Sequence, residues 1–430
     1  MHHHNPTSRR RKGLAVAGAL TLVAALSACS ASSGGEKTTG EDGTITLTVA
    51  TFNEFGYEGL FEEYEAANPG IEIEHKKSGT APDHQDNLYT KLAAGSGLSD
   101  IEAVEVDWLA ALLEQSDQFV DLSDPEVEGR WLDWKADAAT TEDGKLIGYG
   151  TDIGPEAICY RSDLFDKAGL PTDREEVATL FPTWDEYFAV GRDFVAKVPD
   201  TAWFDSTGGI AQAMVNQVEY SFEDADNNVI AAENPEVKEI FETVNEQAAA
   251  GLSTKMPQWS EDWAKAFQND GFATMPCPGW MLGVIEGNAS GVDGWDVANV
   301  FPGGGGNWGG SYLTVPTQSE HPEEAKALAA WLTAPEQQLK AFESKGTFPS
   351  QVDALDDKAL TSSTNAFFND APVGQILAER AEAVELAPHK GPKWGDIHTA
   401  WQQAIQRVDQ GQESVDEAWK TFLADVERLG

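Results

Sequence analysis

Residues 45–74, ITLTVATFNEFGYEGLFEEYEAANPGIEIE, indicate the class of fold. Apolar and polar residues alternate over 45–49 and again over 71–74, which predicts two strands. Between them, apolar side chains recur at helical spacing, namely Leu60, Phe61, Tyr64 and Ala67. Pro69-Gly70 ends that helix. A strand, a helix and a strand in about 30 residues form a βαβ unit, so we predict an α/β fold built on mainly parallel sheets.

Later segments add helices to this pattern. Thr183 and Glu186 have the spacing of a capping box, which predicts a helix start. Three further apolar faces recur at helical spacing: Ala325, Leu328, Ala329 and Leu332; Ile397, Trp401, Ile405 and Val408; and Val415, Ala418, Trp419 and Phe422. The chain shows no internal repeat.

Length and charge limit the classes of protein to consider. The chain has 430 residues, with 72 acidic and 29 basic side chains and a net charge of −43. Such a charge excludes binding to nucleic acid through phosphate contacts. With 41% hydrophobic residues, the chain can bury a sizeable core. At roughly 100 to 200 residues per domain, the length predicts two or three domains rather than one, and we expect two lobes.

The N-terminal segment reads as a secretory signal. Residues 1–28 carry four basic residues, no acidic residue and the apolar run 13–28, which is too short to span a bilayer. The run closes on Leu26-Ser27-Ala28-Cys29, which resembles the lipobox of bacterial lipoproteins and implies acylation of Cys29. The alternative is an ordinary signal peptide that contains a cysteine. Residues 29–43 are small and polar and predict a flexible tether.

The remaining cysteines are Cys159 and Cys277. Outside the cytoplasm they could form a single bridge, and both stand beside apolar residues, which equally suits two buried thiols. The sequence leaves these two alternatives open.

The order of segments resembles the solute-binding proteins of bacterial ABC sugar importers, the family that includes maltose-binding protein. The stretches that carry the resemblance are 60–74, 143–171, 181–187, 272–280, 307–332 and 405–419. CPGWML (277–282) and GGNWGGSYL (305–313) look most like actinobacterial lipoproteins that bind cello-oligosaccharides and their xylo- and chito-oligosaccharide relatives.

The resemblance implies two α/β lobes joined by crossing strands, with the ligand in the cleft between them. By analogy, residues 44–154 and 312–349 form an N-lobe, and residues 155–311 and 350–430 form a C-lobe. The implied partners are an ABC permease with its cytoplasmic ATPase, and the implied location is the outer face of the cytoplasmic membrane. We expect a monomer that is not an enzyme and needs no cofactor or metal.

A sugar offers flat C–H faces and a rim of hydroxyls, so its site needs aromatic rings beside carboxylates or amides. Asn53, Glu54 and Phe55 follow the first predicted strand at its carboxyl end, where α/β sheets place ligands. Asp107 and Trp108, beside Glu105, follow the apolar stretch 101–106, and we choose Asp107 as a hydroxyl acceptor. Asp152 stands at the first expected crossing strand.

Tryptophans in glycine-rich loops are the other candidates, because a loop side chain is often displayed to a ligand. Trp280 follows Pro278-Gly279, and the resemblance places a sugar-stacking tryptophan at this motif. Trp308 and Ser311 lie where the chain returns to the N-lobe, and Trp394 precedes a helix. Trp259 and Trp263 could stack on sugar or pack in the core. The tryptophans expected in the scaffold are Trp184, Trp331, Trp401 and Trp419.

The main rival interpretation is a secreted glycoside hydrolase, which would need a pair of carboxyl groups as acid and nucleophile or base. The sequence contains no G-x-S-x-G or H-E-x-x-H motif. Residues 224–228, DADNN, begin like a calcium loop but lack its turn glycine and final glutamate. A passive surface protein would not explain a resemblance that runs along the chain. We therefore expect a lipid-anchored receptor for a β-linked oligosaccharide.

Overall fold

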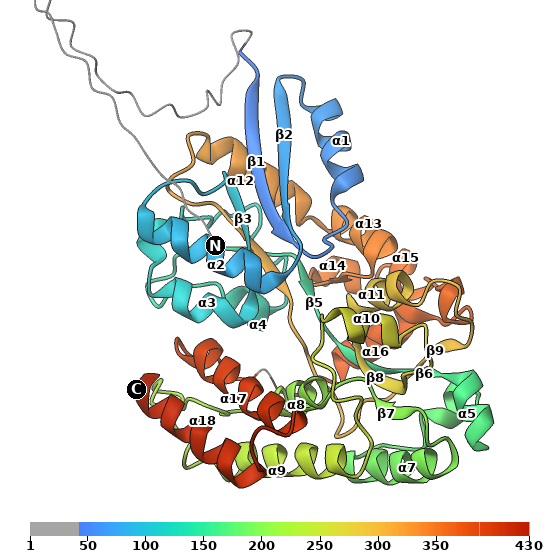
Figure 1. The fold of residues 1–430 in the computed structure, drawn as a ribbon. Coiled ribbons are helices and arrows are strands. Elements are labelled where there is room, and N and C mark those ends of the chain that lie inside the picture. Colours follow the sequence, from blue (N-terminus) through green and yellow to red (C-terminus); the bar gives the residue numbers. More distant parts are fainter. Residues whose placement is uncertain (1–42, 387, 430) are drawn as a thin grey trace, which may run out of the picture. The chain divides into compact units, whose positions relative to one another are not determined.

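The computed structural model describes residues 43–386 and 388–429, which lie within one compact unit (Figure 1). The predicted signal segment, Cys29 and the tether as far as residue 42 lie outside the described residues. Strands and helices alternate along the described chain, so the predicted α/β class is confirmed.

The βαβ unit predicted near the start of the fold is present. β1 (Ile45–Phe52) and β2 (Ile71–Ser78) pair in parallel, and α1 (Glu58–Ala67) connects them. The apolar face of α1 is buried, as its spacing predicts. The last four residues of β1 are buried too, as expected for a strand whose sheet is covered on both faces.

The first sheet has the strand order β2-β1-β3-β10-β4. β3 (Ile101–Glu105) runs parallel to β1, whereas β10 (Ser311–Thr314) runs antiparallel to β3 and to β4 (Tyr149–Gly150). The helices that pack on this sheet are α2 (Ala81–Ala94), α3 (Val106–Leu113), α12 (Pro322–Leu332) and α13 (Pro335–Lys345). The short α4 (Asp133–Asp137) lies beside β4. We call this part the N-lobe.

The second sheet has the order β7-β8-β6-β9 and belongs to the C-lobe. β6 (Glu156–Arg161) is antiparallel to β8 (Phe272–Pro278) and to β9 (Trp295–Ala298), while β7 (Ala202–Phe204) is parallel to β8. The prediction of mainly parallel sheets is therefore wrong. In the first sheet, β10 comes back from the other lobe and adds two antiparallel pairs. In the second sheet, β6 is antiparallel to both of its neighbours. A single βαβ unit does not foreshadow either arrangement.

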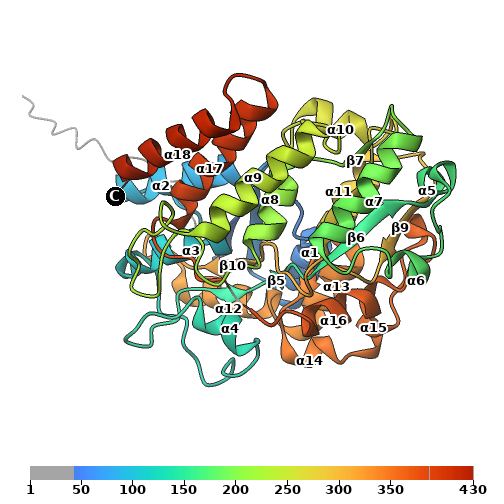
Figure 2. The same ribbon diagram turned by 90° about the horizontal axis from the view of Figure 1, so that it is seen from below.

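The other α-helices of the described chain fall in the segments that we assign to the C-lobe, and Figure 2 shows them from below. They are α5 (Ser162–Ala168), α6 (Arg174–Val177), α7 (Trp184–Lys197), α8 (Thr207–Val215), α9 (Pro235–Ala249), α10 (Glu261–Ala266), α11 (Met281–Asn288), α14 (Val352–Leu355), α15 (Lys358–Thr361), α16 (Val373–Glu382), α17 (Trp394–Asp409) and α18 (Val415–Leu429). The capping box is confirmed, because the Glu186 N–H donates to Thr183 Oγ1 at 3.3 Å at the start of α7. The three other predicted helices are α12, α17 and α18.

Three segments connect the lobes. β5 (Asp152–Ile153) pairs antiparallel with β11 (Phe348–Pro349). The third segment is 307–311. Asn307 forms an isolated antiparallel β-bridge with Pro155, and the Ser311 carbonyl accepts a hydrogen bond from the Thr151 N–H at 2.8 Å. From these crossings we propose the lobe boundaries given above, 44–154 with 312–349 and 155–311 with 350–430.

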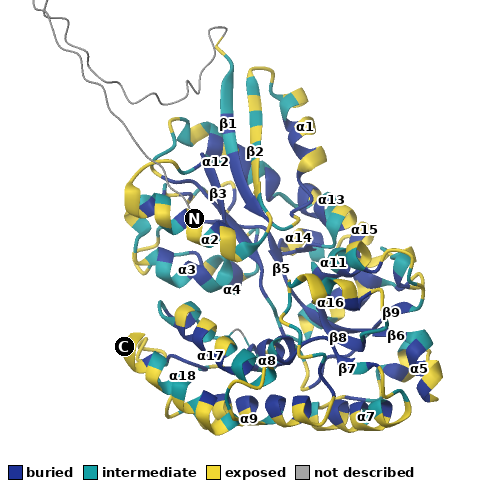
Figure 3. Cartoon of the chain, in the orientation of Figure 1, coloured by how far each residue is buried: buried dark blue, intermediate teal, exposed yellow. Residues whose placement is uncertain are grey.

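Among the described residues, one cluster of buried apolar side chains belongs to the N-lobe and one to the C-lobe, and a third combines C-lobe residues with Ile153, Phe342 and Phe348 near the crossing strands. Figure 3 shows how buried and exposed residues are distributed over the fold. Trp401 is fully buried, Trp184 and Trp419 pack against the same C-lobe cluster, and Trp331 packs against the N-lobe cluster. These four tryptophans are scaffold, as predicted for Trp184 from its capped helix start and for the other three from their helical spacing.

Cys159 and Cys277 form a disulfide, with Cα atoms 5.5 Å apart. They stand on the paired strands β6 and β8, where Ala157 is opposite Cys277. The structure thus selects the single bridge from the two alternatives that the sequence leaves open.

The acidic turn at 224–228 has a local explanation. Asp224 Oδ1 accepts from the backbone N–H groups of Asp226 and Asn228, both at 2.9 Å. The carboxylate therefore stabilises its own turn. Within residues 43–386 and 388–429, no three His, Cys, Asp or Glu side chains are grouped so that they could hold a metal ion.

Candidate functional site

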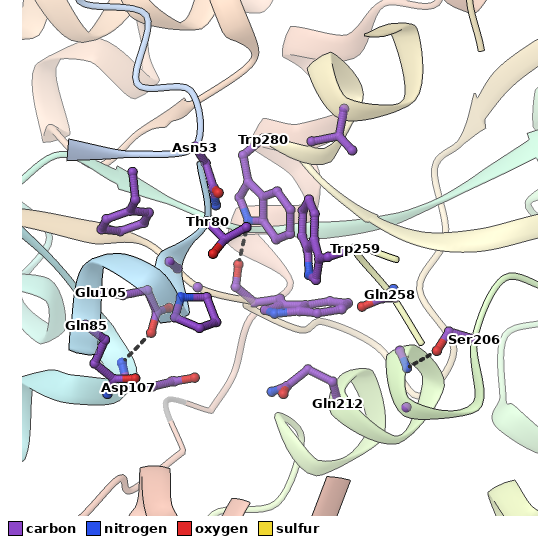
Figure 4. Close-up of a pocket in the computed structure, with 18 of the residues that line it drawn as sticks. Asn53, Thr80, Gln85, Glu105, Asp107, Ser206, Gln212, Gln258, Trp259 and Trp280 are labelled. Carbon is purple, nitrogen blue, oxygen red and sulfur yellow. Dashed lines mark hydrogen bonds between the residues drawn. The ribbon is translucent and has the colours of Figure 1, made fainter. Parts of the chain in front are cut away.

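A pocket of about 1020 Å³ opens between the lobes and is lined by both (Figure 4). Its size is at the upper end of the range for small-molecule sites, about 300–1,000 Å³. The lining begins where strands end: directly after β1, at the end of β3 and after β8. The lining residues fall within 52–55, 77–85, 105–108, 206–212, 256–259, 280–288, 308–311, 345–347 and 398–409, with Asp152.

Nearly all the residues predicted from the sequence meet in this pocket. Those that line it are Asn53, Glu54, Phe55, Asp107, Trp108, Asp152, Trp280, Trp308 and Ser311. Phe55, Trp108, Asp152 and Ser311 are almost entirely buried, so they reach the pocket with a small part of their surface. That these side chains bind a solute stays a prediction.

Trp394 is not among the lining residues, and its predicted place in the site is wrong. It is the first residue of α17 and is 1% exposed within the C-lobe core. Its ring stacks on His398 with centroids 4.6 Å apart, and its Nε1 donates to Ser221 Oγ at 2.9 Å. The sequence pattern predicts that Trp394 lies in a loop before the helix. In the structure Trp394 lies in the first turn of α17 with its side chain in the core, and His398, one turn later, lines the pocket.

Besides the buried rings of Phe52, Phe55 and Trp108, the pocket is lined by three less buried tryptophans, Trp259, Trp280 and Trp308. The rings of Trp259 and Trp280 have centroids 6.1 Å apart and an interplanar angle of 23°. Trp308 stands edge-on to Trp280 at 5.7 Å and 89°, and its carbonyl accepts from Trp280 Nε1 at 3.0 Å. This bond fixes the Trp280 ring by its polar edge. Trp280 is half-buried against Trp259 and Trp308, and the rest of its apolar surface faces the pocket, where a ligand can contact it.

Trp259 is displayed at a conformational cost. Its side chain is 46% exposed, and its backbone φ is +69°, a region that bulky residues rarely adopt. Such strain costs about 1–3 kcal/mol and is concentrated at functional sites. Trp263, in contrast, is 1% exposed and belongs to the core. The structure therefore separates the two tryptophans that the sequence could not assign.

A buried carboxylate holds this loop in place. Asp205 Oδ2 accepts from Gln258 Nε2 at 2.8 Å and from Trp263 Nε1 at 2.9 Å. Burial raises the pKa of Asp205 to about 6, so the group is ionised at neutral pH. Gln258 lines the pocket, and the sequence gives no sign that a residue 53 positions away orients it.

On the N-lobe side, Glu105 and Asp107 stand together at the end of β3. Glu105 Oε2 accepts from the Asp107 N–H at 2.8 Å and so caps α3. Burial, and then the charge of Asp107, raise the pKa of Glu105 to about 8. Glu105 is therefore protonated at pH 7 and can both donate and accept a hydrogen bond. Asp107 Oδ1 is ion-paired with Lys390 of the C-lobe.

Asp152 lies in the crossing strand β5, at the base of the pocket. Its Oδ1 accepts from the Ser311 N–H at 2.9 Å and from Thr151 Oγ1 at 2.7 Å. Burial raises its pKa, and the charge of the buried Lys135 opposes that rise. The carboxyl is thus fixed by the two strands that connect the lobes, which suits a group that must contact a solute held between them.

Glu54 is engaged by two lysines of the pocket wall. Its Oε1 lies 2.5 Å from Lys77 Nζ, and its Oε2 lies 3.3 Å from Lys345 Nζ. Since both oxygens have partners, Glu54 orients these lysines rather than standing free as an acceptor.

Several polar groups of the pocket were missed from the sequence. They are Thr80 and Gln85 of the N-lobe, and Ser206, Gln212, His398 and Gln402 of the C-lobe. In Figure 4, Thr80, Gln85 and Glu105 lie across the pocket from Ser206 and Gln258. Burial lowers the pKa of His398 to about 4, so it is a neutral hydrogen-bonding group. Most of these residues stand at single helical positions without a motif, and only the glycine-rich start of α8, STGG (206–209), offered a signal.

The raised pKa of Glu105 predicts a pH-dependent stability. In the unfolded chain the carboxyl loses its proton near pH 4.5, whereas in the folded protein it keeps it up to about pH 8. The folded state thus binds more protons in this window, so stability falls as pH rises through it. Glu105→Gln cannot ionise, and its free energy of unfolding relative to wild type should rise by a few kcal/mol between pH 5 and 8.

The measurement is urea denaturation of both proteins, without added sugar, at several pH values in that window. Glu54→Gln is the control, because the pKa of Glu54 is lowered rather than raised. A difference between Glu105→Gln and wild type that does not change with pH would contradict the assignment.

The fold and the pocket together define a two-lobed solute-binding protein. The chain belongs to the family of bacterial extracellular solute-binding proteins, whose pattern it matches over residues 59–369.

Individual relatives agree with this class. An arabinooligosaccharide-binding protein of Bacillus subtilis (strain 168) is 27% identical over 390 residues, which cover 84% of this chain and 85% of the relative. A crystal structure of an extracellular solute-binding protein of family 1 is 54% identical, covers 89% of this chain and 99% of its own, and superposes with a TM-score of 0.80.

An ABC transporter associated binding protein from B. animalis subsp. lactis Bl-04, solved in complex with β-1,6-galactobiose, shares the fold. It is 20% identical, covers 90% of this chain and 97% of its own, and has a TM-score of 0.77. Across residues 43–386 and 388–429, no helix has the length and apolar character needed to cross a bilayer.

Proposed function

We propose that the protein captures an oligosaccharide in the interlobe pocket and delivers it to the permease of an ABC importer. The observation that carries the proposal is the group of Trp259, Trp280 and Trp308 in a pocket whose other walls hold amides, hydroxyls and carboxyls. Rings stack on the C–H faces of a sugar, and the polar groups pair with its hydroxyls. The volume of about 1020 Å³ favours a chain of sugar units over a single one.

We propose a β-linked gluco-oligosaccharide of the cello type as the first solute to test, on the strength of the stretches 277–282 and 305–313. Xylo- and chito-oligosaccharides are its closest alternatives. An arabino-oligosaccharide is a second candidate, favoured by the names of two relatives that are 27% and 26% identical.

A glycoside hydrolase remains the rival from another class, since Glu105 and Asp107 put two carboxyl groups in the pocket. Both groups are engaged structurally: Glu105 caps α3 and Asp107 pairs with Lys390. Membership of a solute-binding family also supports the receptor. Chromatography of the sugar after incubation decides between them, because a receptor leaves the oligosaccharide intact.

We further propose that acylated Cys29 anchors the protein to the outer face of the cytoplasmic membrane, with a permease and its ATPase as partners. Several acyl chains would give a stable anchor where one would not. Mass spectrometry of the protein extracted from its native membrane tests this, and an unmodified Cys29 would contradict it.

The solute class is tested by thermal denaturation of residues 30–430 with cello-, xylo-, chito-, arabino- and malto-oligosaccharides. A ligand at 100 times its Kd should stabilise the protein by about 2.7 kcal/mol. We expect the largest shift with the cello series. A shift with the arabino series alone would favour the second candidate, and no shift with any series would contradict oligosaccharide capture.

A further inference from the structure

The lobes also touch beside the pocket, where α3 of the N-lobe meets the N-terminal end of α17 (Figures 1 and 2). The ammonium of Lys390 is ion-paired with Asp107 of α3 and lies 4.4 Å from the centroid of the Trp394 ring. The side chain of Lys390 is only 9% exposed. A single cation of the C-lobe is thus held between a carboxylate of one lobe and an aromatic face of the other.

Of the titratable groups around Lys390, Asp107 is the one that forms an ion pair with it, because the others are uncharged at neutral pH. Glu156 is fully buried, neither of its carboxyl oxygens has a hydrogen-bond partner among the described residues, and burial raises its pKa well above its ordinary value. Glu105 has its pKa raised to about 8 and is protonated at neutral pH. His398 is neutral, since burial lowers its pKa to about 4.

This contact is continuous with the pocket. Asp107 lines the pocket from the N-lobe and His398 lines it from the C-lobe. The Trp394 ring stacks on His398, and the Asp107 carbonyl lies next to Gly395 on the first turn of α17. Asp107, Lys390, Trp394 and His398 therefore form a connected row that joins the two pocket walls.

We propose that Lys390 is a positioning residue that holds the two pocket walls together and so slows the release of the bound solute. The inference rests on the proposed function for its effect on affinity. A partly buried ion pair that closes an interface acts mainly on the dissociation rate. We expect Lys390→Met to raise the Kd about 10-fold, largely through a faster off-rate.

The experiment is stopped-flow tryptophan fluorescence with the best oligosaccharide of the panel, on wild type, Lys390→Met, Asp107→Asn and the double variant. Because Lys390 acts through Asp107, adding Lys390→Met to Asp107→Asn should change the off-rate little. Lys390→Arg keeps the charge and should restore most of the affinity. Lys340→Met is the control. Lys340 Nζ forms an ion pair with Glu63 at 2.8 Å, and Lys340 does not line the pocket.

Small-angle scattering of the solute-free proteins is the second readout. Lys390→Met should have a larger radius of gyration than wild type and than Lys340→Met. The proposal would be overturned if Lys390→Met and Asp107→Asn changed the off-rate independently of each other. It would also be overturned if Lys390→Met left the Kd unchanged or altered only the thermal stability. If wild type binds no sugar, the proposed function fails, and the scattering comparison still decides whether Lys390 holds the lobes together.

Discussion

Trp280→Ala is expected to raise the Kd for the oligosaccharide roughly 30-fold, which corresponds to about 2 kcal/mol. Trp280 stands two residues after the end of β8, lines the pocket and is fixed by the hydrogen bond from its Nε1 to the Trp308 carbonyl. Removing the ring takes away the flat apolar surface on which a sugar would stack. The loss should appear in calorimetric titration without a large change in folding, because Trp280 is only partly buried.

Trp259→Ala provides a companion to this variant. Its ring is 46% exposed beside Trp280, so its removal should weaken binding at little cost to stability. Trp331→Ala is the matched control, since Trp331 is a partly buried tryptophan that packs on Tyr64 in the N-lobe, away from the pocket. Equal affinities of Trp280→Ala and Trp331→Ala would refute the aromatic site.

Removing the disulfide should have the largest effect on stability. Cys159 and Cys277 are separated by 118 residues, and by loop-closure entropy a bridge across a loop of that length stabilises a protein by about 5 kcal/mol. The double variant Cys159→Ala and Cys277→Ala should therefore melt several degrees below wild type in calorimetry. Its sugar affinity should be retained, because neither cysteine lines the pocket.

Two control measurements test whether Cys159 and Cys277 are paired. Residues 30–430 contain Cys159 and Cys277 and no further cysteine, so thiol titration of the denatured, unreduced protein should find no free thiol. Dithiothreitol should lower the melting temperature of wild type and leave that of the double variant unchanged. Two free thiols, or equal melting temperatures, would show that the cysteines do not pair.

The pocket residues that lie at or just after the end of a strand could be predicted from the sequence. Asn53–Phe55, Glu105–Trp108 and Trp280 follow β1, β3 and β8, and the carboxyl edge of a sheet gathers such residues whatever the rest of the fold does. Helical residues such as Gln212 and Gln402 were not predictable, because their place in the pocket depends on how the lobes pack. Amides at such positions carry no local signature.

Two predictions were wrong because the local sequence does not determine the feature in question, namely the direction of a side chain in one case and the direction of a strand in the other. Trp394 reads as a loop tryptophan before a helix, but it begins α17 and turns into the core, and only the rotation of that first turn distinguishes the two outcomes. The parallel βαβ unit of β1 and β2 was predicted correctly, whereas β10 enters the same sheet from the other lobe and runs antiparallel. Sequence spacing does not report the direction of a strand that returns after about 160 residues.

A crystal structure of the protein with the oligosaccharide that stabilises it most tests whether the interlobe pocket captures a sugar. We predict an intact sugar chain between the lobes, with its rings against Trp259 and Trp280 and its hydroxyls within hydrogen-bonding distance of Glu105, Asp152 or Gln258. A sugar bound elsewhere, or a pocket that stays empty at saturating sugar, would show that the pocket between the lobes is not the binding site.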